Sequence, residues 1–167
     1  MSLLLPAAFL GGCSVFGGLS CEDKEADAEL ARLAADPLFD AAPARATAPA
    51  DHRDAGVTTE CDDDSSGPAW LHADRVYAFP GRPEDVLAHY AQKAAPAGWR
   101  ARRDPYPDAP PPSVDGACWT RTTRGRHLMF QIGFDTRGFV SAPRAGNGVV
   151  YVVTVGTEAD SDTACWD

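Results

Sequence analysis

Alternation of large apolar side chains with small or polar ones predicts strands in the second half of the chain. The clearest case is residues 127–135, where one face would carry only large apolar side chains, namely Leu128, Phe130, Ile132 and Phe134. Residues 149–155 are apolar on both faces, which predicts a central strand. Three further strands are expected at residues 70–79, 100–103 and 117–123.

Apolar residues at helical spacing predict two helices. The first covers residues 21–35, with Ser20 placed to cap its start and one apolar face made of Ala26, Leu30, Leu33 and Ala34. This pattern leaves open whether the helix packs on the domain or lies exposed near a membrane. The second helix begins at Pro83 and ends before Pro96 and Gly98. Trp99 follows directly, and we expect its ring to pack between the helix end and the sheet.

The segment between the first helix and the first expected strand has little periodicity. Residues 36–59 are rich in Ala, Pro and Asp, which is typical of a linker or a long surface loop, and Leu38 and Phe39 are expected to anchor its start to the core. The order of elements predicts an α+β fold: a mostly antiparallel sheet of about five strands with one helix packed on a face, plus an N-terminal helix.

Length and charge narrow the class of protein. A chain of 167 residues suits one small domain, and its formal net charge of −9 argues against general nucleic-acid binding, which needs a basic surface. We therefore expect no nucleic-acid partner.

The apolar opening of the chain ends in Leu10-Gly11-Gly12-Cys13. A short apolar run with small residues before a cysteine resembles the export signal of bacterial lipoproteins, which would make Cys13 the lipid-modified N-terminus. Two alternatives are an ordinary cleaved signal peptide and a signal anchor that continues through Leu19. We expect a signal peptide at residues 1–12, a lipidated N-terminus with helix and linker at 13–59, and a small disulfide-stabilised α+β domain at 60–167.

The other cysteines support export. If Cys13 carries lipid, four remain, which is the even number that an oxidising compartment and two disulfides would produce. Three pairings are possible, and we favour Cys118 with Cys165 and Cys21 with Cys61. A zinc site is the less favoured alternative, because there is no C-x-x-C pair and no histidine at ligand spacing from a cysteine.

One acidic segment begins like a calcium loop. Asp62, Asp64 and Ser66 alternate and Gly67 follows, but the twelfth position, where a bidentate Glu should complete the site, is Ala73. We interpret this segment as a solvated turn beside a disulfide, and we expect no metal and no cofactor.

No catalytic motif is evident. The sequence has no G-x-S-x-G elbow and no H-E-x-x-H pair, and its four histidines, His52, His72, His89 and His127, are scattered over expected loops, strands and helices. We expect each to be a surface or hydrogen-bonded structural histidine.

Several arginines could form a cationic patch. They lie around three expected strands, and the candidates for an anionic ligand are Arg102, Arg103, Arg121, Arg124 and Arg126, with Arg100 beside them. Such a patch could contact lipid headgroups or anionic envelope polymers. The alternative is that these arginines pair with Asp104, Asp108 and Asp115 on a solvated face of the sheet.

Three short stretches stand ahead of Cys118 and a closing Val-Tyr-Val strand: Val76-Tyr77-Ala78-Phe79, Pro83-Glu84-Asp85-Val86-Leu87-Ala88-His89-Tyr90 and Ala97-Gly98-Trp99. This arrangement resembles small secreted actinobacterial lipoproteins. The resemblance covers the chain from about Cys61 onward and implies a fold and a location outside the cytoplasm, but no catalytic residues.

The sequence therefore predicts a membrane-tethered extracytoplasmic lipoprotein on the outer face of the cell membrane, acting as a noncatalytic binding module for an envelope polymer or protein. It would be secreted if the lipid site is not used. The alternative is an exported hydrolase-type enzyme with an unusual site, using His127 or His89 with an acidic neighbour. The sequence makes no prediction of oligomeric state.

Overall fold

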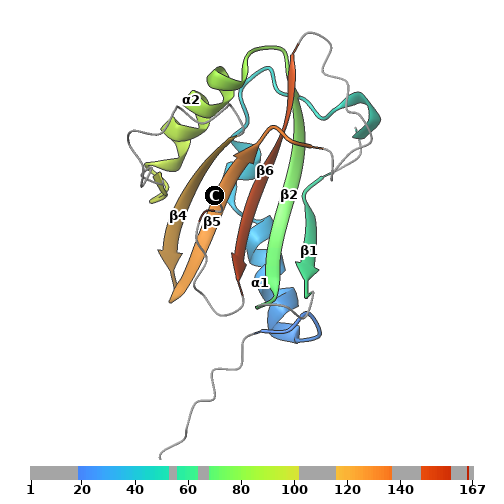
Figure 1. Ribbon diagram of the computed structural model, residues 1–167, viewed down its shortest axis with the longest axis vertical. Helices are drawn as coiled ribbons and strands as arrows, with labels where there is room; N and C mark the ends of the chain where they lie inside the picture. Colours follow the sequence, from blue (N-terminus) through green and yellow to red (C-terminus); the bar gives the residue numbers. More distant parts are fainter. Residues whose placement is uncertain are drawn as a thin grey trace, which may run out of the picture.

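Figure 1 shows the computed structural model of the chain, which describes residues 19–52, 56–63, 68–101, 116–136, 148–158 and Cys165. Two α-helices, α1 (Lys24–Ala34) and α2 (Pro83–Ala94), accompany one sheet of six strands. The strands are β1 (Thr58–Asp62), β2 (Trp70–Phe79), β3 (Arg100–Ala101), β4 (Gly116–Thr123), β5 (Arg126–Gly133) and β6 (Val149–Glu158). The predicted α+β class is confirmed, with six strands in place of about five.

All neighbouring strands of the sheet are antiparallel, in the order β1-β2-β6-β5-β4-β3. The pairing of β2 with β6 is the longest and runs from Trp70 opposite Glu158 to Phe79 opposite Val149. As the two-sided apolar pattern predicted, β6 is a central strand, and Val153 is fully buried on it.

The strand that the sequence did not predict is β1. Its five residues are polar or half-exposed, so they lack the apolar alternation that indicates a strand. The strand forms because it pairs with β2, from Thr58 opposite Asp74 to Asp62 opposite Trp70. Residue 60, at which we expected the domain to begin, lies inside it.

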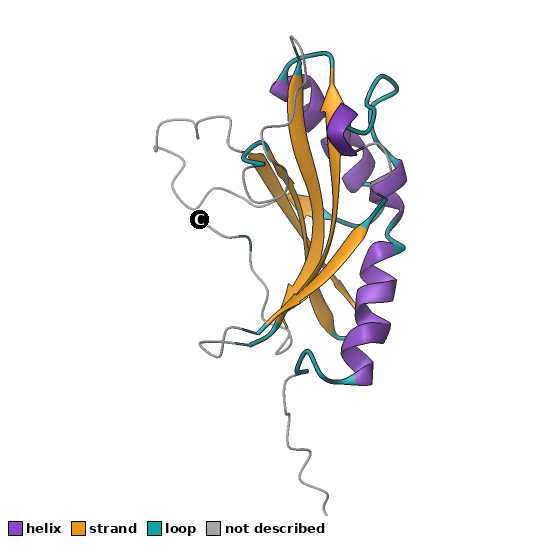
Figure 2. Cartoon of the chain, turned by 90° about the vertical axis from the view of Figure 1, so that its right-hand side faces the viewer, coloured by secondary structure: helices purple, strands orange, loops and turns teal. Residues whose placement is uncertain are grey.

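Both helices cover the same face of the sheet (Figure 2). Helix α1 packs on β1 and β2 and buries Ala26 and Leu33. The sequence left open whether this helix packs on the domain or lies exposed, and in the structure it is packed. Helix α2 lies toward β4 and buries Val86, Tyr90 and Ala94. The core therefore lies between the sheet and this single layer of helices.

Aromatic rings fill the core beneath α2. The ring of Tyr90 lies 5.7 Å from that of Phe130 and 6.0 Å from that of Tyr151. Trp99 is 3% exposed, and its ring lies 5.6 Å from that of Phe130. Trp99 thus joins the end of α2 to the sheet, as expected, and a buried ring of this kind contributes about 1.5–3 kcal/mol.

The segment at residues 36–59 contains more regular structure than the linker or loop that we expected. A 3-10 helix, Pro37–Asp40, buries Leu38 and Phe39, which anchor the start of the segment as predicted. Further on, Thr47 and Ala78 exchange backbone hydrogen bonds of 2.9 and 2.8 Å, which attaches the segment to β2. These contacts hold the segment against the domain.

The structure contains two disulfides, which confirms that prediction. Cys21 and Cys61 join the chain before α1 to β1, with their Cα atoms 5.6 Å apart. Cys118 and Cys165 join β4 to the C-terminal region, with a Cα separation of 5.9 Å. These are the two pairs favoured from the sequence.

Candidate functional site

A pocket of about 500 Å³ lies between α1 and the β4–β5 hairpin. Leu128 and Val155, both buried on the face of the sheet that carries the helices, form its floor. Residues of the second half of α1 and of the turn that follows form one wall, and residues 121–126 contribute to the other. An apolar floor with polar walls is the usual composition of a ligand pocket.

The walls of the pocket carry more positive than negative charge. Four arginines line it, Arg32, Arg121, Arg124 and Arg126, against the two carboxylates of Glu29 and Asp36. The ionised side chains thus give a net charge of +2, whereas the whole chain carries −9. The pocket is therefore a local cationic site on an acidic protein.

The Arg121 side chain links three parts of the structure. Its Nη2 atom donates to Oδ2 of buried Asp36 over 2.9 Å, and its Nη1 atom donates to the carbonyl oxygen of Ala97 over 3.2 Å. Its guanidinium carbon lies 4.3 Å from the centre of the Trp99 ring. Arg121 is therefore held by an ion pair and a cation–π contact, and it forms a fixed part of the pocket wall.

Two other arginines of the pocket share one carboxylate. Glu29, whose side chain is 9% exposed, forms an ion pair with Arg32 on the same helix. The Nε atom of Arg126 lies 3.9 Å from the same Oε2 atom of Glu29. Because one carboxylate faces two guanidinium groups, this side of the pocket keeps a positive charge.

The fourth arginine lies at the tip of the β4–β5 hairpin. Thr123 pairs with Arg126, so Arg124 and Gly125 form a two-residue turn, and both have positive φ, of 51° and 78°. This is the conformation that two-residue hairpins require, and Asn or Gly is the usual residue at its first central position. Arg124 is exposed there, at the rim of the pocket.

The structure brings part of the predicted arginine patch together. Arg121, Arg124 and Arg126 line one pocket, whereas Arg102 and Arg103 lie outside the described residues, as do the alternative partners Asp104, Asp108 and Asp115. Sequence reasoning missed Arg32. A signal was present, because Glu29 and Arg32 lie three residues apart and therefore on one side of the helix.

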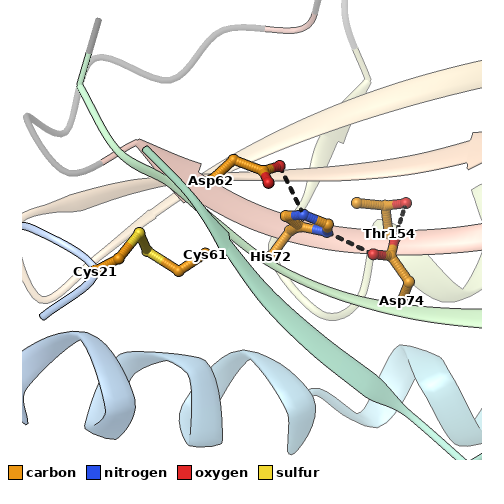
Figure 3. Close-up of polar contacts among 6 residues, drawn as sticks. All are labelled: Cys21, Cys61, Asp62, His72, Asp74 and Thr154. Atoms are coloured by element: carbon orange, nitrogen blue, oxygen red, sulfur yellow. Dashed lines mark hydrogen bonds and ion pairs between the residues drawn. A yellow bond between two sulfur atoms is a disulfide. The ribbon is translucent and has the colours of Figure 1, made fainter. Parts of the chain in front are cut away.

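A second polar cluster lies outside this pocket, on β1, β2 and β6 (Figure 3). His72 is 7% exposed and lies between two carboxylates. Its Nδ1 atom is 2.5 Å from Oδ2 of Asp74, and its Nε2 atom is 3.3 Å from Oδ2 of Asp62. Asp74, itself buried, also accepts a hydrogen bond from Oγ1 of Thr154 over 2.5 Å.

The Trp70 ring restricts the position of the His72 ring. The ring of Trp70 is stacked on it with centroids 5.8 Å apart, and the Trp70 ring also covers Gly156 of β6, where an added Cβ would lie 2.3 Å from Cη2. Burial disfavours the imidazolium ion, but the hydrogen bond and charge of Asp74, followed by those of Asp62, outweigh this effect and raise the pKa of His72.

The histidines named for the enzyme alternative have other surroundings. Nε2 of His89 lies 2.6 Å from the carbonyl oxygen of Ala41, and Nδ1 of His127 lies 3.1 Å from the hydroxyl of Thr122. His72, in contrast, has two carboxylate neighbours. Sequence reasoning missed this cluster, although His72 and Asp74 alternate with buried Leu71 and Ala73 and so had to share one face of a strand.

The acidic segment that begins like a calcium loop, and that we interpreted as a solvated turn, starts inside the sheet. Asp62 is the last residue of β1, and Ala73, at the twelfth position, is buried in β2 opposite Thr59. Residues 64–67 lie outside the described part of the chain. Asp62 therefore presents its carboxylate from a paired strand.

No family model, curated protein or solved structure matches this chain. Among the described residues, no helix has the length and apolar character needed to span a bilayer. Cys13 and the apolar run before it lie outside these residues.

Proposed function

We propose that this chain is a membrane-tethered extracytoplasmic lipoprotein whose domain binds an anionic component of the cell envelope without catalysing a reaction. The observation that carries the proposal is the arginine-lined pocket: four guanidinium groups surround about 500 Å³ with an apolar floor. The resemblance to small actinobacterial lipoproteins remains part of this proposal.

The leader and the cysteines support the location. The small residues before Cys13 suit lipid modification, and the oxidised pairs Cys21–Cys61 and Cys118–Cys165 suit an oxidising compartment. A lipid-modified cysteine would hold the domain at a membrane surface, since each buried methylene contributes about 0.8 kcal/mol.

The chemistry of the walls supports a phosphate-bearing ligand. Guanidinium groups present planar pairs of donors that match the oxygens of phosphate. Arg121 is held rigidly by Asp36 and Trp99, whereas Arg124 is exposed at the rim and can turn toward a ligand. The pocket thus combines a fixed cation with an adjustable one.

The position of the pocket fits a tethered domain. The turn of the β4–β5 hairpin and the start of α1 both lie at the lower end of the molecule in Figure 1. A lipid at Cys13, eleven residues before α1 begins at Lys24, would place this end of the domain toward the membrane. An anionic polymer near the membrane surface would then lie at the end of the domain that carries the hairpin.

The proposal is tested by calorimetric titration of the oxidised protein with inorganic phosphate and with a phosphodiester-linked polyol polymer, using dextran as the neutral control. We expect saturable binding of the two phosphate-containing ligands and none of dextran. Arg124→Glu and Arg126→Gln should each weaken the affinity at least 10-fold, about 1.4 kcal/mol. The matched control Arg100→Glu, at an exposed position on β3 away from the pocket lining, should change the affinity less than twofold.

Two outcomes of this titration would contradict the proposal. One is the absence of saturable binding by the polymer. The other is equal loss of binding in Arg100→Glu and Arg124→Glu, which would indicate general charge attraction rather than a pocket. Circular dichroism of each variant checks that the fold is retained.

The second candidate function, an exported hydrolase-type enzyme, is favoured by the buried His72 with Asp74 on its Nδ1 atom. A carboxylate in this position orients an imidazole and stabilises its charged form. A screen with ester and phosphoester substrates tests this candidate: turnover that His72→Gln abolishes and His127→Gln leaves unchanged would support it. Turnover that is absent, or equal in both variants, would contradict it.

A further inference from the structure

The histidine–carboxylate cluster provides a set of metal ligands that is separate from the arginine pocket. One donor atom each from Glu60, Asp62 and His72 lies within 4.8 Å of the others. We propose that these three side chains bind a divalent first-row transition metal, of which Zn²⁺ is the test case, and that Asp74 positions the His72 ring.

The His72 ring has the orientation that a metal ligand needs. Its Nδ1 atom lies 2.5 Å from Asp74 and is placed to donate an N–H hydrogen bond to that carboxylate, while Nε2 faces the more exposed Asp62. A ligating histidine commonly donates its second ring N–H to a carboxylate in this way, which fixes the tautomer and directs the other nitrogen to the metal.

The spacing of one donor pair fits a tetrahedral ion. Two ligands about 2.0–2.1 Å from such an ion lie about 3.3 Å apart. The separation of His72 Nε2 from Asp62 Oδ2 is 3.3 Å, which matches this spacing. Glu60 lies directly opposite His72 in the register of β1 and β2, and because its side chain is exposed it can move toward the ion by rotating.

The ligands are carried on a rigid frame. His72 is 7% exposed and is held by the stacked Trp70 ring and by Asp74, which Thr154 of the neighbouring strand holds in turn. The Cys21–Cys61 disulfide fixes β1 at the residue between Glu60 and Asp62. A buried, oriented imidazole beside two carboxylates on paired strands distinguishes this cluster from a group of surface acids.

The donor set selects the class of metal. Imidazole nitrogen suits Zn²⁺ and other first-row transition metals, whereas Ca²⁺ and Mg²⁺ prefer sites made of oxygen alone. Three protein ligands leave a position at the ion for water. We therefore expect Zn²⁺ to bind more tightly than Ca²⁺.

The experiment is a calorimetric titration of the oxidised, tag-free protein with ZnCl₂ and with CaCl₂ after treatment with a chelator. We expect one equivalent of Zn²⁺, bound at least 10-fold more tightly than Ca²⁺. Asp62→Asn, at an exposed position where folding should be unaffected, should weaken Zn²⁺ binding at least 10-fold. Asp74→Asn should weaken it by about 10- to 100-fold through loss of ring orientation.

The matched control is His127→Gln, an exposed histidine outside the cluster, which should change the Zn²⁺ affinity less than twofold. Because His72→Gln could affect folding, the role of His72 is tested by nitrogen NMR of the unaltered protein. Addition of Zn²⁺ should shift the side-chain nitrogen resonances of His72 and leave those of His127 unchanged. The proposal is overturned by absence of saturable Zn²⁺ binding, by full affinity in Asp62→Asn, by tighter binding of Ca²⁺, or by zinc-induced shifts at His127 in place of His72.

Discussion

The Nδ1 atom of His72 lies 2.5 Å from Oδ2 of Asp74, and both residues are more than nine-tenths buried. The other carboxylate oxygen of Asp74 accepts from Thr154 on β6, so the pair also connects β2 with the centre of the sheet. Such a buried pair stabilises the fold only while both partners are present, since a lone buried charge or donor is costly.

We predict that Asp74→Asn lowers the free energy of unfolding by about 1–3 kcal/mol, because the neutral amide has one acceptor oxygen in place of two and lacks the charge that stabilises a protonated His72 ring. Urea denaturation of the chelator-treated protein measures this change. Thr154→Val removes a single hydrogen bond and should cost about 1 kcal/mol. An Asp74→Asn variant as stable as the parent protein would show that the pair contributes nothing.

The raised pKa of His72 predicts a dependence of stability on pH in the metal-free protein. Asp74 of β2 and Asp62 and Glu60 of β1 face the ring, and the first two raise its pKa in the folded state. The unfolded histidine titrates at about 6.5, so the stabilisation is fully present below that pH and is lost as the pH rises through the higher folded pKa.

This prediction is checked by comparing the free energies of unfolding of the parent protein and His72→Gln at about pH 6 and about pH 9. The advantage of the parent protein should be larger at the lower pH. A direct nitrogen NMR titration in which His72 titrates below its ordinary value would contradict the sign.

The two disulfides should contribute similarly to stability. Their sequence separations are 40 and 47 residues, for which the loop-closure model gives about 4 kcal/mol each. We therefore expect Cys21→Ala/Cys61→Ala and Cys118→Ala/Cys165→Ala to lower the midpoint of urea unfolding by comparable amounts. In the Cys21→Ala/Cys61→Ala variant, faster hydrogen exchange should be confined to α1 and β1, because this disulfide joins the chain before α1 to β1. Uniformly faster exchange over the whole domain would contradict this local role of the disulfide.

Arg121 should be more important for stability than the other arginines of the pocket. Its guanidinium group contacts Asp36, Ala97 and the Trp99 ring at once, and Asp36 is buried. Arg121→Ala should lower the free energy of unfolding by about 2–3 kcal/mol, because the buried carboxylate of Asp36 loses its charged partner and keeps only the hydrogen bond from the Leu38 amide. Arg124→Ala, at the exposed hairpin tip, should change it by less than about 0.5 kcal/mol. Equal effects of the two substitutions would contradict the structural role of Arg121.

The lipid tether is tested by the intact mass of the protein isolated from membranes. We expect a chain that begins at Cys13, carries diacylglycerol, and lacks four hydrogens because of its two disulfides. Cys13→Ser should move the protein from the membrane fraction to the soluble fraction. A mass that retains Met1 would contradict the lipid tether. Four free thiols would contradict the two disulfides.

Elements that bury a face were predictable, because burial leaves a periodic pattern in the sequence. Residues 70–79 were predicted as a strand and form β2, and the pattern after Pro83 predicted α2. In contrast, β1 is polar and partly exposed, and its position depends on pairing with β2. A non-local pairing of this kind leaves no local signal.

The same reason explains which parts of the sites were missed. Asp62 and His72 are ten residues apart and meet only because β1 pairs with β2. Arg121 was a candidate for the cationic patch, but its partner Asp36 lies 85 residues earlier in the chain. Sequence patterns identified the strands that carry these residues, whereas the contacts between them follow from the topology of the sheet.

The most direct test of the proposed anion binding is its location on the protein. In a titration with inorganic phosphate followed by amide NMR, we predict saturable shifts confined to the segments that contribute the pocket lining, residues 29–36 and 121–128, and to Val155. Arg124→Glu should reduce these shifts, and Arg100→Glu should leave them unchanged. Shifts centred on other cationic residues, such as Arg75, Arg82 or Arg100, or no saturable shift at the pocket, would contradict the account.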